Sequence, residues 1–92
     1  MQGNIAVRGE VDLFTFAVTN AGLHTIETAG NTDTFVTLSG PNSQAVMITE
    51  DDDSGPGTNS RIVTTLAPGN YFVRVRHYSM DGTGVYSITV RR

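Results

Sequence analysis

Side chains alternate between apolar and polar along most of this sequence, and this period of two limits the possible folds most strongly. Tyr71, Val73 and Val75 fall on one face of such a segment, and Arg74 and Arg76 fall on the other. Successive side chains of a β-strand point to opposite faces of the sheet. No window sustains apolar residues at helical spacing, so the sequence predicts strands and no helix longer than one turn.

The same alternation predicts the inward faces of two more strands, Phe14, Phe16 and Val18 in one and Tyr86, Ile88 and Val90 in the other. Clusters of Gly, Asn and Pro interrupt the alternation every 8–12 residues or so, as in β-sandwiches and barrels. We predict about eight strands, near residues 3–8, 12–20, 22–29, 33–39, 44–49, 60–66, 70–78 and 84–91. The predicted fold is an all-β, antiparallel β-sandwich that forms a single domain over residues 1–92.

Length and charge limit the possible partners. A chain of 92 residues has room for one domain with one modest core. Its net charge of −3 and its lack of lysine argue against nucleic acid, which requires a positive surface. Without cysteine it has no disulfide or thiolate metal site, and no apolar stretch is long enough to span a membrane.

The position of Met1, directly before strand-like sequence, suggests a piece of a longer protein. We therefore expect the targeting signal to lie outside the sequence.

Asp51, Asp52 and Asp53 form an acidic run in the longest irregular stretch of the sequence. Carboxylate oxygens in a flexible loop suit Ca²⁺, and Asp12 and Asp33 would add ligands if their turns fold beside this loop. The run lacks the spacing of an EF-hand. The alternative is a solvated acidic turn that protects a strand edge and aids solubility.

Six segments, taken in order, carry a resemblance to a known family: 9–16, 32–38, 51–55, 60–62, 66–75 and 82–90. The first follows the pattern G-x-x-D-x-F-x-F, from Gly9 to Phe16. The ordered set resembles bacterial pre-peptidase C-terminal domains, whose relatives include the collagen-binding domains of clostridial collagenases. The order of the segments makes the resemblance specific, since each of them alone occurs in many β-proteins.

This resemblance implies a jelly-roll-like sandwich placed after the catalytic domain of a secreted bacterial metallo- or serine peptidase. Such domains are often removed on maturation, or they help the enzyme engage insoluble protein. The implied function is a non-catalytic accessory domain that aids folding, secretion or attachment to substrate. The implied partners are the catalytic domain of the parent chain and insoluble protein substrate.

The resemblance also implies a calcium site. Collagen-binding relatives hold calcium at the base of the sandwich, between a segment before the first strand and the acidic turn that enters the second. The second part corresponds to Glu10 and Asp12 here. Only Met1, Gln2 and Gly3 lie before or at the start of the predicted first strand, so the first part has no counterpart in the sequence.

A candidate ligand-binding stripe lies between Tyr71 and Tyr78. Collagen recognition in the relatives relies on aromatic residues of the corresponding strand. This sequence keeps Tyr78 but has Arg74 and Arg76 where an aromatic surface is expected. The stripe of Arg74, Arg76 and Tyr78 would bind a ligand by stacking and hydrogen bonding, and the alternative is an ordinary solvated strand face.

Catalysis by this chain is not expected. The sequence has no G-x-S-x-G motif, and a domain of this size offers little room for a cleft. His24 and His77 lie in separate predicted strands without a second ligand at metal spacing. Two further interpretations stay open: a calcium- or carbohydrate-binding adhesion module of a bacterial surface protein, and a spacer without a ligand.

Overall fold

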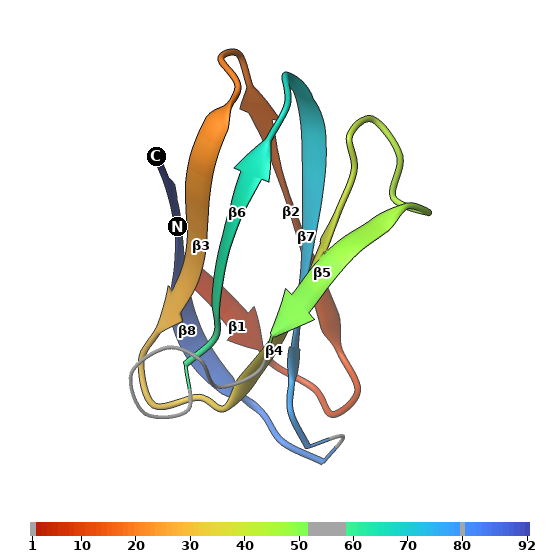
Figure 1. Cartoon of the computed structure of the whole chain (residues 1–92). Coiled ribbons are helices and arrows are strands. Elements are labelled where there is room, and N and C mark those ends of the chain that lie inside the picture. Colours follow the sequence, from red (N-terminus) through yellow and green to blue (C-terminus); the bar gives the residue numbers. More distant parts are fainter. Residues whose placement is uncertain (1, 52–58, 80) are drawn as a thin grey trace.

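The described parts of the chain, residues 2–51, 59–79 and 81–92, form eight strands and no helix in a computed structural model (Figure 1). The strands are β1 (Gln2–Ile5), β2 (Val11–Val18), β3 (Gly22–Ala29), β4 (Thr34–Ser39), β5 (Met47–Asp51), β6 (Arg61–Leu66), β7 (Gly69–His77) and β8 (Gly84–Arg91). These residues thus contain no helix that is long and apolar enough to cross a membrane.

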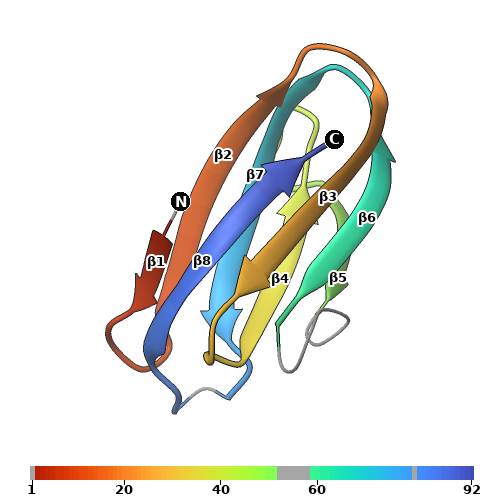
Figure 2. The ribbon, with the colours of Figure 1, turned by 90° about the vertical axis from the view of Figure 1, so that its left-hand side faces the viewer.

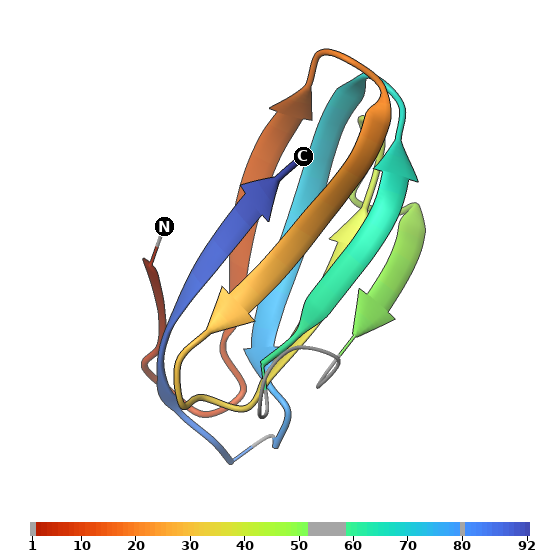
Figure 3. The same cartoon turned by 60° about the vertical axis from the view of Figure 1, so that its left-hand side comes forward.

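The strands form two four-stranded sheets that lie face to face. One sheet has the order β1-β8-β3-β6 and the other β2-β7-β4-β5, and every paired strand is antiparallel. Figures 2 and 3 show β8, β3 and β6 crossing in front of the second sheet. Successive strands change sheet except at the β4–β5 hairpin, which gives a jelly-roll-like order. The predicted antiparallel sandwich of about eight strands is confirmed.

The core consists of the inward faces that the alternation predicts. Its members are Ile5, Val18, Ile26, Val36, Leu38, Ile62, Leu66, Tyr71, Val73, Val75, Tyr86 and Ile88. Phe14, Phe16 and Val90 are partly buried and pack against this cluster. Strand β7 lies between β2 and β4, so three of its side chains reach the middle of the core.

Two predicted strands differ from the observed ones by three residues at one bound, and the others differ by two residues at most. The fifth was predicted at 44–49, but β5 begins three residues later, because the β4–β5 connection closes through a hydrogen bond from the Gly40 N–H to Val46 O at 2.9 Å. Glu50 and Asp51 therefore belong to a strand and not to the acidic loop. The first was predicted at 3–8 but ends at Ile5, because the chain turns before Glu10, whose N–H donates to Val7 O at 3.2 Å.

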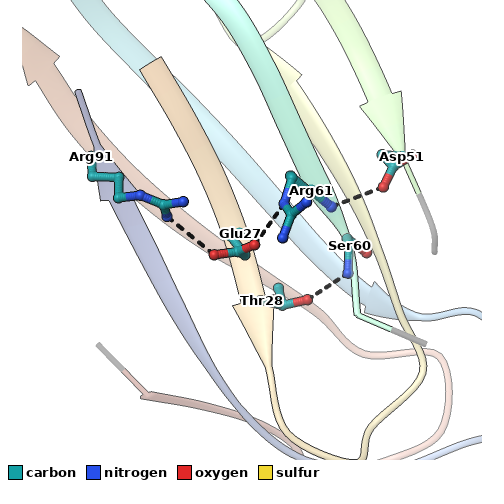
Figure 4. Close-up of polar contacts among 6 residues, drawn as sticks. All are labelled: Glu27, Thr28, Asp51, Ser60, Arg61 and Arg91. Atoms are coloured by element: carbon teal, nitrogen blue, oxygen red, sulfur yellow. Dashed lines mark hydrogen bonds and ion pairs between the residues drawn. The ribbon is translucent and has the colours of Figure 1, made fainter. Parts of the chain in front are cut away.

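A buried hydroxyl cluster joins the two sheets near the end of β3. Thr28, Thr34 and Ser60 are fully buried. The Ser60 N–H donates to Thr28 Oγ1 at 2.8 Å (Figure 4), and the Ser60 hydroxyl donates to the Thr34 carbonyl at 2.9 Å. Because buried polar groups are costly when unpaired, this closed network favours a single arrangement of the strand ends that it joins.

Candidate functional site

One end of the sandwich, at the bottom of Figure 1, gathers several of the predicted acidic residues. Strands β1, β5 and β7 end there, and β2, β4 and β8 begin there. Glu10, Asp12, Asp33 and Asp51 therefore share what we call the acidic end. Their common location could not be read from the sequence, since it depends on how the strands pair.

Glu10 and Asp12 form a close carboxyl pair at the acidic end. The hydrogen bond with Asp12 raises the pKa of Glu10, and loss of solvent and the negative charge of Asp12 act in the same direction. The Ala6 N–H donates to Glu10 Oε1 at 3.2 Å, which ties the carboxyl group to the β1–β2 connection. The structure thus brings Glu10 and Asp12, both predicted as site residues, within interaction distance of each other.

Tyr86 belongs to this group, although the alternation predicted only that it lies in the core. Its hydroxyl donates to Asp12 Oδ2 at 2.6 Å, from β8 of one sheet to β2 of the other. Burial, and secondly this hydrogen bond, raise the pKa of Tyr86 above its ordinary value. No local pattern could have revealed the contact, because 74 residues separate the partners.

Asp51 and Asp33 make different contacts. Asp51 Oδ2 accepts a hydrogen bond from the Arg61 N–H at 2.8 Å (Figure 4), which joins β5 to β6. The main-chain carbonyl of Asp33 accepts from the Tyr78 N–H at 2.8 Å. The other two predicted acids, Asp52 and Asp53, lie outside the described residues.

These acids do not complete a metal site within the described residues. There, no group of three His, Cys, Asp or Glu side chains is placed to hold a metal ion. Calcium takes about six to eight oxygen ligands, so Glu10 and Asp12 would provide only a part of such a site. Calcium binding therefore stays a prediction.

The predicted stripe lies on the outer face of the β2-β7-β4-β5 sheet, and neighbours hold both arginines. Arg74 Nη2 donates to Gln44 Oε1 at 3.0 Å. The Arg76 guanidinium stacks on the Phe35 ring, 4.3 Å from its centroid, and also donates to the Tyr78 carbonyl at 3.2 Å. The side chain of Tyr78 is exposed.

A pocket of about 380 Å³ brings residues of the two predicted sites together. Its lining is Gly9, Glu10, Val11, Arg76, His77, Tyr78 and Ser79. The pocket forms because Val11 at the start of β2 pairs with Arg76 near the end of β7. We call it the Glu10–Arg76 pocket. Its lining includes one acidic, one basic and one aromatic residue, which are Glu10, Arg76 and Tyr78.

A charged cluster on the opposite sheet escaped the sequence reasoning. Glu27 Oε2 lies 2.7 Å from Arg61 Nε, and Glu27 Oε1 lies 3.1 Å from Arg91 Nη1 (Figure 4). The hydrogen bond from Arg61, with a smaller contribution from Arg91, lowers the pKa of Glu27. The three residues lie on neighbouring strands β6, β3 and β8, so the cluster ties three strands together.

Comparison with known proteins identifies the family. The family model described as the bacterial pre-peptidase C-terminal domain matches residues 10–77. Among solved structures, the pre-peptidase C-terminal domain of collagenase from Bacillus anthracis has the same fold, with a TM-score of 0.81 at 19% sequence identity. The match covers 99% of this chain and 86% of that one. No curated protein matches the sequence. With three quarters of its length matched by the family model, the chain belongs to the bacterial pre-peptidase C-terminal domain family.

Proposed function

We propose that this chain is the non-catalytic accessory domain of a secreted bacterial peptidase, and that it attaches the enzyme to its protein substrate. The family match over residues 10–77 carries the accessory role. The solved relative is a domain of a collagenase, which supports a peptidase as the parent protein. Secretion or display at the cell surface follows from the same proposal, since a peptidase that acts on insoluble protein works outside the cell.

The outer face of the β2-β7-β4-β5 sheet is our proposed attachment surface. Arg74 and Arg76 stand there on the central strand β7 as hydrogen-bond donors for carbonyl and carboxylate groups of a protein. Their contacts with Gln44 and Phe35 restrain them before binding, which reduces the entropy lost on association. The exposed ring of Tyr78 supplies apolar contact area beside them.

Co-sedimentation with insoluble protein tests the attachment proposal. The chain should sediment with insoluble collagen or elastin and stay in solution with cellulose, which serves as the carbohydrate control. The double variant Arg76→Ala/Tyr78→Ala should weaken the binding to protein about tenfold or more, because it removes a hydrogen-bond donor and an aromatic contact from the proposed surface. A tenfold loss of affinity corresponds to about 1.4 kcal/mol of binding free energy. Leu23→Ala/Val63→Ala, on the outer face of the other sheet, is the matched control and should bind like the unmodified chain.

Each contrary outcome has a definite meaning. Absence of the chain from both protein pellets would reject attachment as its function. Binding to cellulose alone would favour the carbohydrate-binding adhesion module. Equal loss of binding in both double variants would show that the sheet face holding Arg76 and Tyr78 is not the attachment surface.

A further inference from the structure

The four edge strands of the sandwich differ in how they are protected against pairing with another chain. Natural edges are blunted by shortness, charges, proline or bulges. Strand β1 has only four residues, β5 has a register shift opposite Leu38 and Ser39 and carries Glu50, and β6 begins with Arg61. The outer face of β2 shows none of these features, and β2 is twice as long as β1, so β2 offers an unblunted edge.

Strand β2 offers a long and regular edge. It pairs with β7 without interruption from Val11 to Val18, and no other described strand pairs with it. In an edge strand, alternate residues direct their N–H and C=O groups away from the sheet. Its outward side chains are Val11, Leu13, Thr15 and Ala17, all exposed and uncharged. The one charged side chain of β2, Asp12, accepts a hydrogen bond from Tyr86.

Two hollows border this edge at a spacing that suits an extended peptide. One is the Glu10–Arg76 pocket, which includes Val11. The other has a volume of about 430 Å³ and is lined by Thr15, Phe16, Ala17, Asn70 and Phe72. Val11 and Thr15 are four residues apart, or about 13 Å along a strand, which is the distance between side chains i and i+4 of an extended chain.

We infer that the free edge of β2 binds an extended segment of the protein substrate as an added β-strand. In this binding mode, main-chain hydrogen bonds supply affinity, and pockets for alternate side chains supply specificity. The inference deepens the proposed function and rests on it, because it names the form in which substrate is held: a single extended strand recognised through its backbone.

The surroundings of the two hollows indicate which side chains fit them. The first hollow is lined by both Glu10 and Arg76, and the Arg76 guanidinium stacks on Phe35 of β4, on the side of β7 away from β2, so this end of the added strand suits a polar, uncharged side chain. The second hollow is bounded by Phe16 and Phe72, which suit an aromatic or aliphatic side chain. The segment is therefore one in which a polar, uncharged residue and an apolar residue lie four positions apart.

The test uses a capped eight-residue peptide in which threonine alternates with glutamine, valine and phenylalanine, with glutamine and phenylalanine four positions apart. Amide NMR spectra of the whole chain are recorded during titration with this peptide and with a scrambled peptide of equal composition. We expect concentration-dependent changes in the amide chemical shifts of β2 and its neighbour β7 with the alternating peptide only.

Two N-methylated peptides test the backbone hydrogen bonds. They are modified at odd or at even positions and so lack opposite sets of backbone N–H donors. One of them should bind at least tenfold more weakly, while the other should bind normally.

Leu13→Lys places a charge on the edge and should weaken binding of the peptide at least tenfold. Leu23→Lys is the matched control, since Leu23 is an exposed leucine (59%, against 48% for Leu13) on the other sheet, and it should bind normally. Circular dichroism shows whether both variants fold.

Three outcomes would overturn the inference: equal binding of the two N-methylated peptides, chemical-shift changes confined to other strands, or formation of β2–β2 dimers. If the chain still sediments with insoluble protein in any of these cases, the proposed function survives without this binding mode; if it fails to sediment, both fall.

Discussion

The Tyr86 hydroxyl lies 2.6 Å from Asp12 Oδ2, and this hydrogen bond joins the two sheets of the sandwich at the acidic end. The ring of Tyr86 also packs tightly over Gly3, where an added Cβ would lie 2.2 Å from a ring carbon. One side chain therefore links β8, β2 and β1. Because Asp12 also pairs with Glu10, the candidate site and the fold share these residues.

Removing the Tyr86 hydroxyl should destabilise the domain more than removing that of Tyr71. Tyr86→Phe leaves a carboxylate without its donor and should cost about 1.5–3 kcal/mol, as is usual for hydrogen bonds to charged groups. Tyr71→Phe removes a 2.6 Å hydrogen bond to the neutral Ala67 carbonyl and should cost about 0.5–1.5 kcal/mol. Urea denaturation of both variants measures the difference. Equal costs would mean that Asp12 finds another donor or is fully hydrated.

Truncation of the buried tyrosines tests the core. Tyr71 and Tyr86 are 1% and 4% exposed, so replacing either with Ala should cost about 3–5 kcal/mol through lost burial and the cavity left behind. Tyr78→Ala is the control, because its ring is 53% exposed. Thermal and urea unfolding report the effect. Melting curves close to that of the unmodified chain for both core variants would contradict the strand assignment.

The Arg61–Glu27–Arg91 cluster should make stability depend on pH. The pKa of Glu27 is lowered below its ordinary value of 4.5, so the folded state favours the ionised carboxylate. Its contribution is therefore present above that value and lost as the pH falls through the lowered pKa. Glu27→Gln should be less stable than the unmodified chain at pH 7, and the gap should close in acid. A gap that is constant between about pH 7 and pH 3 would show that charge is not the cause.

Glu10→Gln should show the opposite pH dependence. The pKa of Glu10 is raised above 4.5, so the ionised form is disfavoured in the folded state. The variant should be more stable than the unmodified chain at pH 7, and this advantage should vanish as the pH falls and Glu10 becomes protonated. The midpoints of urea unfolding of the variant and of the unmodified chain, measured across the acid range, test this prediction. A variant that is less stable at pH 7 would mean that the carboxylate makes a net favourable contact.

The calcium prediction is tested by thermal unfolding in EDTA and then in calcium. An ion present at about a hundred times its Kd stabilises the fold by about 2.7 kcal/mol, which should raise the midpoint by about 10 °C or more. Loss of this rise on replacing Asp51, Asp52 and Asp53 with Asn would assign the ion to the acidic run. A rise that persists in this variant but is lost in Glu10→Gln would assign it to the Glu10–Asp12 pair. An unchanged midpoint would contradict the prediction.

The amino-acid sequence by itself determined the strands and their inward faces. Alternation placed Tyr71, Val73 and Val75 in the core, and the structure buries all three. This works because a strand's side-chain period is a local property of the backbone. The bounds of β5 escaped prediction, since they depend on the β4–β5 connection and on the register shift opposite Leu38.

Only the tertiary structure decided which residues share a site. The sequence named Glu10, Arg76 and Tyr78 separately, but it could not show that they line one pocket, because that follows from the pairing of β2 with β7 across about sixty intervening residues. The sequence likewise did not predict the hydrogen bond between Tyr86 and Asp12. Strand order and sheet packing are set by the burial of a common core, a global free-energy minimum that no local pattern encodes.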